Sequence, residues 1–426
     1  MSQKAKAIGV AACALLGNSA AAQAEPPKWE IDTATLIYSE IDRVSLIEPV
    51  IALRRNWGER SFGARLTLDS LTGPSPSGAT PASTMQTFTG ASGGGDLYTA
   101  EPGEIPLDDA FRDTRVALAL DYSAPLFGGW AASYGFNFSK EYDYQSIGAS
   151  LRVLRDFNQH NTTLSAGVAY AQDTIEPVGE VPLPLAVIQR RYSEDDSDGE
   201  NRSLRDASDS KSVGDLLVGI TQVIDPHSLV RANLVFSQSS GYLTDPYKIV
   251  SVVGTDGEPL RYVREGRPDS RTKTGVFTEY LRDFSGDTLR LSYRFLTDDW
   301  GIDSHTLETS YRLPFGTSSY VEPQLRYTIQ SAADFYRVAL FDGEEQTVQN
   351  VSADYRLGAM SAWTAGVQIG HKLQSGSDIS LRLAYYMQTP KEDAVPAQAA
   401  AGLSKFGELV PDTQAVMATI AYRFDW

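Results

Sequence analysis

The C-terminal end of the chain alternates between apolar and polar positions. Every second residue from Val416 to Trp426 is apolar, whereas Thr419, Arg423 and Asp425 lie between them. A period of two indicates a β-strand with one apolar face. The chain therefore ends in a strand whose faces meet different environments.

Tyr422, Phe424 and Trp426 place aromatic side chains at the very end of this strand. The ending resembles the assembly signal of bacterial outer-membrane proteins, whose last strand closes on Phe or Trp. The resemblance implies the outer-membrane assembly machinery as a partner.

The same alternation recurs along the chain. In 320–330, Leu325, Tyr327 and Ile329 oppose Arg326 and Thr328. We predict an all-β fold, a transmembrane antiparallel up-and-down β-barrel of about sixteen strands, in which apolar faces meet lipid and polar faces line a lumen. The strands are expected at 29–40, 45–55, 60–70, 111–122, 130–140, 143–154, 161–173, 211–223, 229–239, 271–282, 287–298, 302–312, 319–331, 358–372, 377–388 and 413–426.

Loop lengths support the barrel over the alternative, a soluble all-β protein. Alternate connections are short and rich in Gly, Pro, Asn or Asp, such as 56–58 and 314–316, as tight turns require. The long connections all fall on the opposite, outer side, at 71–110, 174–210, 240–270, 332–357 and 389–412. A soluble sandwich has no reason to sort its loops by length.

The N-terminus has the pattern of a secretory signal. Lys4 and Lys6 precede an apolar stretch, and Ala22-Gln23-Ala24 is a cleavage site, which predicts a signal peptide at 1–24 and a barrel over 25–426. Cys13 is the only cysteine. Cleavage would remove it, together with any disulfide or thiolate chemistry. These features predict the outer membrane of a Gram-negative bacterium.

The formal net charge is −17. Nucleic acid is therefore not expected as a partner, because phosphate binding needs a basic surface. Alternation nevertheless places many arginines on the lumen face. This lumen charge ladder comprises Arg65, Arg115, Arg152, Arg231, Arg290, Arg294, Arg312, Arg326, Arg382, Glu279, Glu308 and Glu322. It is interpreted either as a field across a pore or as a salt-bridge network that braces or plugs the barrel.

A second group of charged residues is expected at the outer rim. This outer-rim acidic cluster comprises Asp143, Asp245, Asp298, Asp299 and Asp303. Carboxylates could bind Ca²⁺ there, although their spacing matches no known metal loop. His305 lies near these residues, but alternation puts it on the lipid face, which argues against a rim protease. No catalytic residue is predicted, and the chain is not expected to be an enzyme.

Residues 69–80, DSLTGPSPSGAT, resemble the signature of a family of proteobacterial outer-membrane proteins of unknown function. SKEYDY at 139–144, GYLTDPYK at 241–248 and RFLTDDWGIDSHT at 294–306 look like further family segments. The resemblance implies a barrel, and genes nearby for a flavin transferase, a small lipoprotein and a thioredoxin-like protein. Envelope redox proteins and the lipoprotein are thus candidate partners.

That context draws attention to hydroxyl groups in the first long loop. Covalent FMN is attached to a Ser or Thr ending a D-x-x-[ST]-G-A-[ST] motif. Ser75, Thr80 and Ser92 end similar segments, each of which departs from the motif. The alternative is an ordinary flexible Gly/Ser/Thr/Pro loop.

The sequence thus predicts a porin-like conduit for small solutes or ions, which could serve an envelope redox or metal system and could form a homo-oligomer. The alternatives are a non-transporting scaffold or receptor whose acidic outer loops bind a cation or protein, and a covalent flavin carrier or rim enzyme. No cofactor beyond the candidate Ca²⁺ or FMN is expected.

Overall fold

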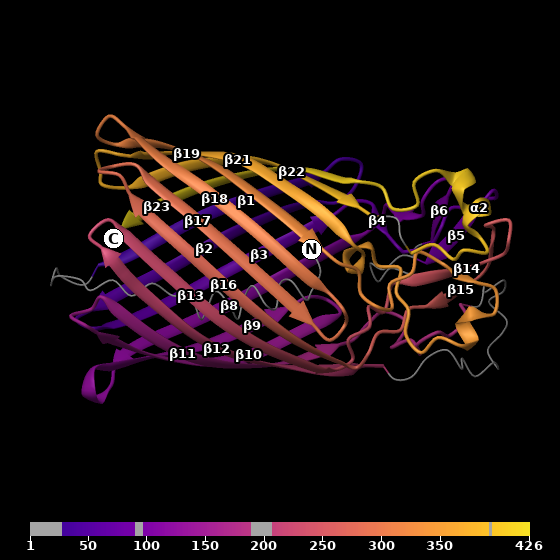
Figure 1. Cartoon of the computed structure of the whole chain (residues 1–426), viewed down its shortest axis with the longest axis horizontal. Helices are drawn as coiled ribbons and strands as arrows, with labels where there is room; N and C mark the ends of the chain where they lie inside the picture. The colour runs from indigo at the N-terminus through magenta and orange to yellow at the C-terminus, as the bar shows by residue number, and fades with distance from the viewer. Residues whose placement is uncertain (1–27, 90–96, 189–206, 392–393) are drawn as a thin grey trace.

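The computed structural model describes residues 28–89, 97–188, 207–391 and 394–426. Sixteen long strands form one closed antiparallel barrel (Figure 1). They are β1(Trp29–Glu40), β2(Ser45–Trp57), β3(Arg60–Thr72), β8(Arg112–Pro125), β9(Trp130–Lys140), β10(Tyr144–Phe157), β11(Thr162–Ile175), β12(Asp209–Asp225), β13(Ser228–Gly241), β16(Ser270–Asp283), β17(Thr288–Asp298), β18(Asp303–Phe315), β19(Ser319–Gln330), β21(Met360–Lys372), β22(Asp378–Pro390) and β23(Thr413–Asp425).

The first and last strands pair and close the barrel. Ile37 of β1 lies opposite Ala418 of β23. At the end of the ladder, Trp29 and Trp426 exchange two backbone hydrogen bonds, with N–O distances of 2.9 and 2.8 Å. The described barrel strands therefore leave no unpaired edge within the sheet, which is how a sheet satisfies its backbone without water.

The two faces of the sheet differ as the alternation predicted. Leu325 and Ile329 are exposed on the outer face of β19, and Leu381 and Leu383 are exposed on the outer face of β22. The residues between them, such as Arg326 and Arg382, point to the lumen. In the described residues, no helix is long and apolar enough to cross a membrane.

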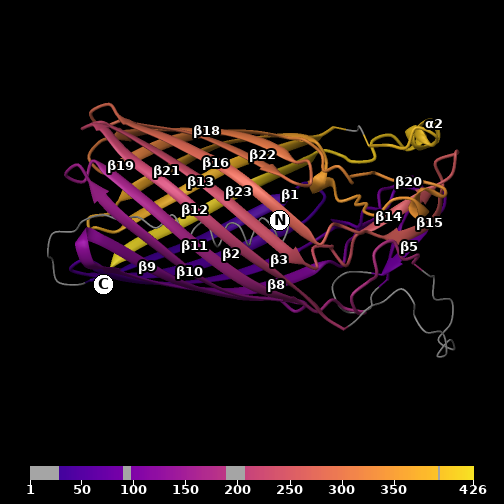
Figure 2. The same ribbon diagram turned by 60° about the horizontal axis from the view of Figure 1, so that its bottom comes forward.

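The two ends of the barrel are built differently. At one end the strands are joined by short turns, among them Gly58, Ser285 and Gly316, whose positive φ angles suit a tight reversal. At the other end five long connections leave the barrel, and their described parts fold together into a cap (Figures 1 and 2). We call these the turn end and the cap end.

The cap contains short strands and helices. A three-stranded sheet has the order β15(Pro259–Arg264), β14(Ile249–Val253), β20(Leu340–Phe341), and the last two strands pair in parallel. Two small hairpins come from the first long loop, β4(Ser75–Pro76) with β7(Leu107–Asp108), and β5(Gln86–Thr89) with β6(Leu97–Ala100). One short helix, α2(Ala400–Leu403), lies in the last long loop.

The predicted barrel class and strand number are confirmed, and each predicted strand end lies within three residues of the observed one. The five long connections are 73–111, 176–208, 242–269, 331–359 and 391–412, all at one end, as expected. The sequence interpretation missed their contents, because it treated them as plain loops and not as a folded cap. The predicted signal peptide, 1–24, lies outside the described residues.

Candidate functional site

The inner wall of the barrel carries all twelve residues of the lumen charge ladder. Each lies on the strand face opposite the exposed apolar residues, as Arg152 does beside Leu151 and Arg65 beside Leu66. Nine of the twelve are arginines and three are glutamates. The same face also carries acids outside the ladder, among them Asp69, Asp173 and Asp298, so the excess of positive charge belongs to the ladder alone.

One row of the ladder runs across neighbouring strands. The register places Arg326 of β19 opposite Glu308 of β18, and Arg231 of β13 opposite Glu279 of β16. The Nη2 atom of Arg326 lies 2.6 Å from the Oε2 atom of Glu308. Glu279 is shared, with Arg231 Nη1 at 3.6 Å from one carboxylate oxygen and Arg290 Nε at 3.7 Å from the other. The Glu279 carboxylate is thus the shared ion-pair partner of Arg231 and Arg290.

A second row lies on β18, β19 and β22. Arg312 Nε donates to Glu322 Oε2 at 2.7 Å, and the guanidinium also stacks over the Tyr320 ring, 4.1 Å from its centroid. Arg382 donates to Gln324 at 2.8 Å instead of to a carboxylate. The neutral partner leaves the charge of Arg382 uncompensated at that contact.

Charged side chains on the inner wall are exposed to solvent in the body of the barrel and buried under the cap. The side chains of Arg290, Arg326 and Arg312 are 57%, 52% and 48% exposed. By contrast, the inner-wall pairs Lys211–Asp173 and Arg271–Asp298 near the cap have acids that are completely buried. Arg115 is likewise buried against Asp69 there. The lumen is therefore open to solvent along its arginine-rich part and covered at the cap end.

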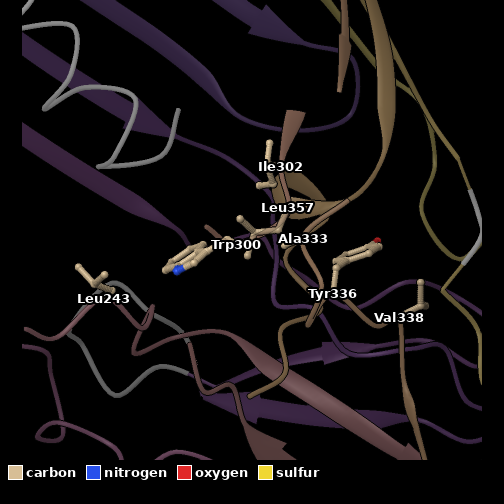
Figure 3. Close-up of a cluster of buried hydrophobic side chains, with 7 residues drawn as sticks. All are labelled: Leu243, Trp300, Ile302, Ala333, Tyr336, Val338 and Leu357. Atoms are coloured by element: carbon tan, nitrogen blue, oxygen red, sulfur yellow. The ribbon is translucent and has the colours of Figure 1, made fainter. Parts of the chain in front are cut away.

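Hydrophobic packing seals the cap to the barrel mouth. Trp300 and Ile302, from the β17–β18 connection, pack with Leu243, Ala333, Tyr336, Val338 and Leu357 from two long loops (Figure 3). The Trp300 ring also lies 4.4 Å from the guanidinium carbon of Arg271 on the inner wall. The cluster thus joins separate loops to the rim.

A buried charge network lies beside this cluster. It consists of Asp245, Glu265, Arg267, Asp354 and Arg356. Arg267 Nη2 donates to Asp354 at 2.9 Å, and Arg356 Nε donates to the other oxygen of the same carboxylate at 2.6 Å. Arg356 also reaches Asp245 at 3.2 Å, and the Asp245 backbone N–H donates to Glu265 at 2.6 Å. We call this group the cap network.

Asp354 and Glu265 in the cap network have opposite pKa shifts. Burial alone would raise the pKa of Asp354, but the guanidinium groups of Arg356 and Arg267 hold this pKa far below its usual range. Burial raises the pKa of Glu265, and Arg267 opposes that rise only in part. The Asp354 carboxylate is therefore expected to stay ionised and to accept hydrogen bonds from both arginines.

The predicted outer-rim acidic cluster is not assembled as a cation site. Asp143 accepts from the Tyr247 hydroxyl at 2.6 Å, and Asp245 belongs to the cap network. Asp298 pairs with Arg271 and accepts from backbone N–H groups of the following turn, whereas Asp299 accepts from the Thr272 N–H at 2.9 Å. Asp303 is exposed on β18. No group of three or more His, Cys, Asp or Glu in the described ranges is arranged to hold a metal ion.

The candidate flavin sites are placed unevenly. Thr80 is only 3% exposed, and its backbone N–H donates to the Ser251 hydroxyl at 2.9 Å. An enzyme therefore could not reach the Thr80 hydroxyl while the cap is folded. Ser75 lies half-buried in β4. Ser92 lies outside the described residues. His305 faces outward, as the alternation predicts, and contacts the Tyr293 hydroxyl at 2.7 Å.

Comparison with protein families gives one match. The family described as "Protein of unknown function (DUF3570)" matches residues 5–424. The chain belongs to this family. No curated protein matches the chain.

Three solved structures show a distant similarity to the chain. A bacterial polysaccharide outer membrane secretin shares 8% identity at a TM-score of 0.44, with 93% of this chain and 98% of that chain covered. Pseudomonas aeruginosa OccK2 (OpdF) shares 9% identity at a TM-score of 0.40, with 94% and 98% covered. Acinetobacter baumannii OccAB1 shares 7% identity at a TM-score of 0.40, with 94% and 96% covered. These likenesses are too distant to carry a functional argument.

The cap network was missed by the sequence interpretation apart from Asp245. Its members lie far apart in the chain, since 87 positions separate Arg267 from Asp354. A local signal did exist for the nearby strands. The runs IVSVV at 249–253 and PLRYVR at 259–264 flank GTDGE, which is the pattern of a hairpin.

Proposed function

We propose that this protein is an outer-membrane conduit for small solutes that favours anions. The observation that carries the proposal is the local group of solvent-exposed arginines on the inner faces of β17, β18 and β19. Four arginines, Arg290, Arg294, Arg312 and Arg326, share these faces with Glu308, Glu322 and Asp298, and Asp298 is buried against Arg271. A fixed positive wall in a water-filled passage raises the local concentration of anions.

The outer surface of the barrel supports a membrane location. Exposed leucine, isoleucine, valine and aromatic side chains cover it on strand after strand, including Leu164, Leu234, Leu307 and Ile420. A soluble protein rarely exposes so continuous an apolar surface. A closed antiparallel barrel with such a band is the form in which strands cross a lipid bilayer. Together with the expected signal peptide, this favours the outer membrane of a Gram-negative bacterium.

Guanidinium groups suit the proposed role because of their geometry. Arg290 and Arg326 are about half exposed, so each can offer donors to a passing solute while one edge remains paired to glutamate. Planar guanidinium groups recognise carboxylate or phosphate oxygens through two parallel hydrogen bonds. The wall therefore favours small oxyanions over halides.

The test is the reversal potential of single channels in planar bilayers under a KCl gradient. We expect selectivity for chloride over potassium, which decreases in the triple variant Arg290→Gln, Arg294→Gln, Arg326→Gln. The control Arg282→Gln removes an arginine at the turn end that pairs with Asp225, and should leave the reversal potential unchanged. Cation selectivity of the native protein, or an unchanged reversal potential in the triple variant, would contradict the proposal.

The sealed cap favours a second candidate, a receptor or scaffold that does not conduct. Tyr336 and Leu357 lie in the packed cluster at the mouth, and the charged pairs beneath are dry. Bilayer recordings separate the two functions. If neither the native protein nor a variant with a loosened cap conducts, the receptor or scaffold function is favoured. If only the variant conducts, the protein is a conduit gated by its cap.

A further inference from the structure

The cap holds a cavity of about 360 Å³ between the β19–β21 and β22–β23 connections. Its size falls within the usual range for small-molecule sites. Two backbone hydrogen bonds fix its walls relative to each other: Val338 N–H donates to Ala394 O at 3.0 Å, and Lys391 N–H donates to Ala359 O at 2.9 Å. The cavity is therefore a built feature of two loops that are distant in sequence.

The walls of the cavity are largely apolar. Ala332, Tyr336, Ala359 and Val395 line it, and Tyr336 belongs to the sealing cluster drawn in Figure 3. Small alanine side chains leave the space, and the buried cluster behind Tyr336 keeps that wall rigid. Such walls favour an apolar body, such as a ring or a short chain.

Among the described residues that line the cavity, two are cationic and one is acidic. Arg337 and Lys391 line it and are exposed. The Arg337 guanidinium donates to two backbone carbonyl oxygens, of Asp334 at 3.2 Å and of Tyr336 at 2.7 Å. The acid among the described lining residues, Glu344, accepts from the Phe341 backbone N–H at 2.8 Å. Carbonyl oxygens fix the orientation of Arg337 without neutralising its charge.

A neighbouring cavity of about 340 Å³ shares Arg337 but has the opposite balance of charge. Asp299 and Asp334 line it, and Arg337 is the single cation among the described residues around it. An anion is therefore favoured only on the Ala332 side of Arg337. An anionic ligand is therefore expected in the cavity lined by Ala332 and Tyr336.

We infer that the cavity at Arg337 is a binding site for a small organic monoanion with an apolar body, such as an aromatic carboxylate. The carboxylate lies at Arg337, and the apolar body lies against Ala332 and Tyr336. As a subsite for solutes that reach the barrel from outside, it rests on the proposed conduit function. Binding itself does not require conduction, so the two can fail separately.

The experiment measures binding of benzoate to the full-length folded barrel in non-ionic detergent, by saturation-transfer NMR titration. Acetate supplies the charge alone and benzyl alcohol the ring alone, so both should bind more weakly than benzoate. Arg337→Gln should weaken benzoate binding about tenfold or more, because a hydrogen bond to a charged group is lost. The matched control Arg261→Gln changes a cap arginine already paired with Asp342 and Glu345, and should leave binding unchanged.

A pair of filling variants locates the site. Ala332→Phe fills the proposed cavity and should abolish binding, whereas Asn350→Phe fills the neighbouring cavity and should not. Retained heat-modifiable mobility shows that each variant is folded. The inference is overturned by absence of saturable benzoate binding to the native protein, by equal binding to Arg337→Gln, or by loss of binding in Asn350→Phe alone. Conductance of the same samples reports separately on the conduit.

Discussion

Gly257 and Gly402 touch backbone to backbone across two loops of the cap. A Cβ atom on Gly402 would lie 2.1 Å from the carbonyl carbon of Asp256, and one on Gly257 would lie 2.4 Å from the carbonyl carbon of Gly402. Neither position can accept a side chain without separating the β14–β15 hairpin from α2. This contact ties the last long loop to the central sheet of the cap.

Gly402→Ala should therefore loosen the cap while leaving the barrel intact. We expect faster proteolysis within 391–412 and a higher open probability in bilayer recordings, because the clash is with backbone and cannot be relieved by a side-chain rotation. Gly214→Ala is the matched control, because nothing lies within 4 Å of a Cβ atom at that position of β12. Equal protease resistance of the two variants would count against the role of this contact.

Removing the negative charge of Glu279 should change ion selectivity in the opposite direction from removing an arginine of the ladder. Glu279→Gln leaves Arg231 and Arg290 without their shared carboxylate. We expect chloride selectivity to increase, as measured by the reversal potential in a KCl gradient, whereas Arg294→Gln should decrease it. Shifts of the same sign in both variants would show that the wall charge does not govern selectivity.

The cap network should make cap stability depend on pH. The pKa of Asp354 is far below its unfolded value because Arg356 and Arg267 outweigh the effect of burial. A depressed folded pKa means that the unfolded loop binds more protons, so its contribution is complete above the unfolded pKa of about 4 and is lost as pH falls below it. Hydrogen exchange of residues 352–357, corrected for the intrinsic pH dependence of amide exchange, should accelerate below about pH 4.

Asp354→Asn serves as the control for that pH dependence. It should remove the acid-induced acceleration and lower cap stability at neutral pH by about 3 kcal/mol, because the buried Arg267 and the partly exposed Arg356 lose their common carboxylate. Persistence of the acid effect in this variant would assign it to another group. Glu265 is the alternative to consider, although its raised pKa favours the folded cap at low pH and so acts with the opposite sign.

Deletion of Trp426 should slow barrel assembly. Its backbone exchanges two hydrogen bonds with Trp29 where the first and last strands meet, and its side chain is 81% exposed. We expect accumulation of unfolded chain in the periplasm, measured as loss of heat-modifiable protein in membranes. Trp426→Phe keeps both the backbone pair and an aromatic terminus and should assemble normally; equal yields of the deletion variant would argue against a terminal signal.

The barrel was predictable because its rules are local. One slip of register would turn Arg326 to lipid and Leu325 to the lumen, so the alternation fixes both faces at once. The turn end was equally visible, since residues such as Gly58 and Gly316 mark reversals of the chain. Strand ends differ by up to three residues where strands continue beyond the apolar band.

The cap was not predictable in the same way, because its contacts are between distant segments. Val252 of β14 pairs in parallel with Leu340 of β20, and no sequence pattern near either residue predicts this pairing. The acids expected at the rim show the same limit. Asp245 and Asp298 looked like free carboxylates in sequence, yet each meets an arginine from another segment, Arg356 and Arg271.

The parallel pairing of β14 with β20 has a consequence for the order of assembly. Four barrel strands, β16 to β19, separate the two segments along the chain, so the pair is a non-local contact that we expect to form after those strands are in register. We therefore expect a finished cap to mark barrels in which the strands between its two segments are in register. A barrel with a slipped strand would expose its unpaired loops, and surface proteases would remove it while leaving correctly built molecules untouched.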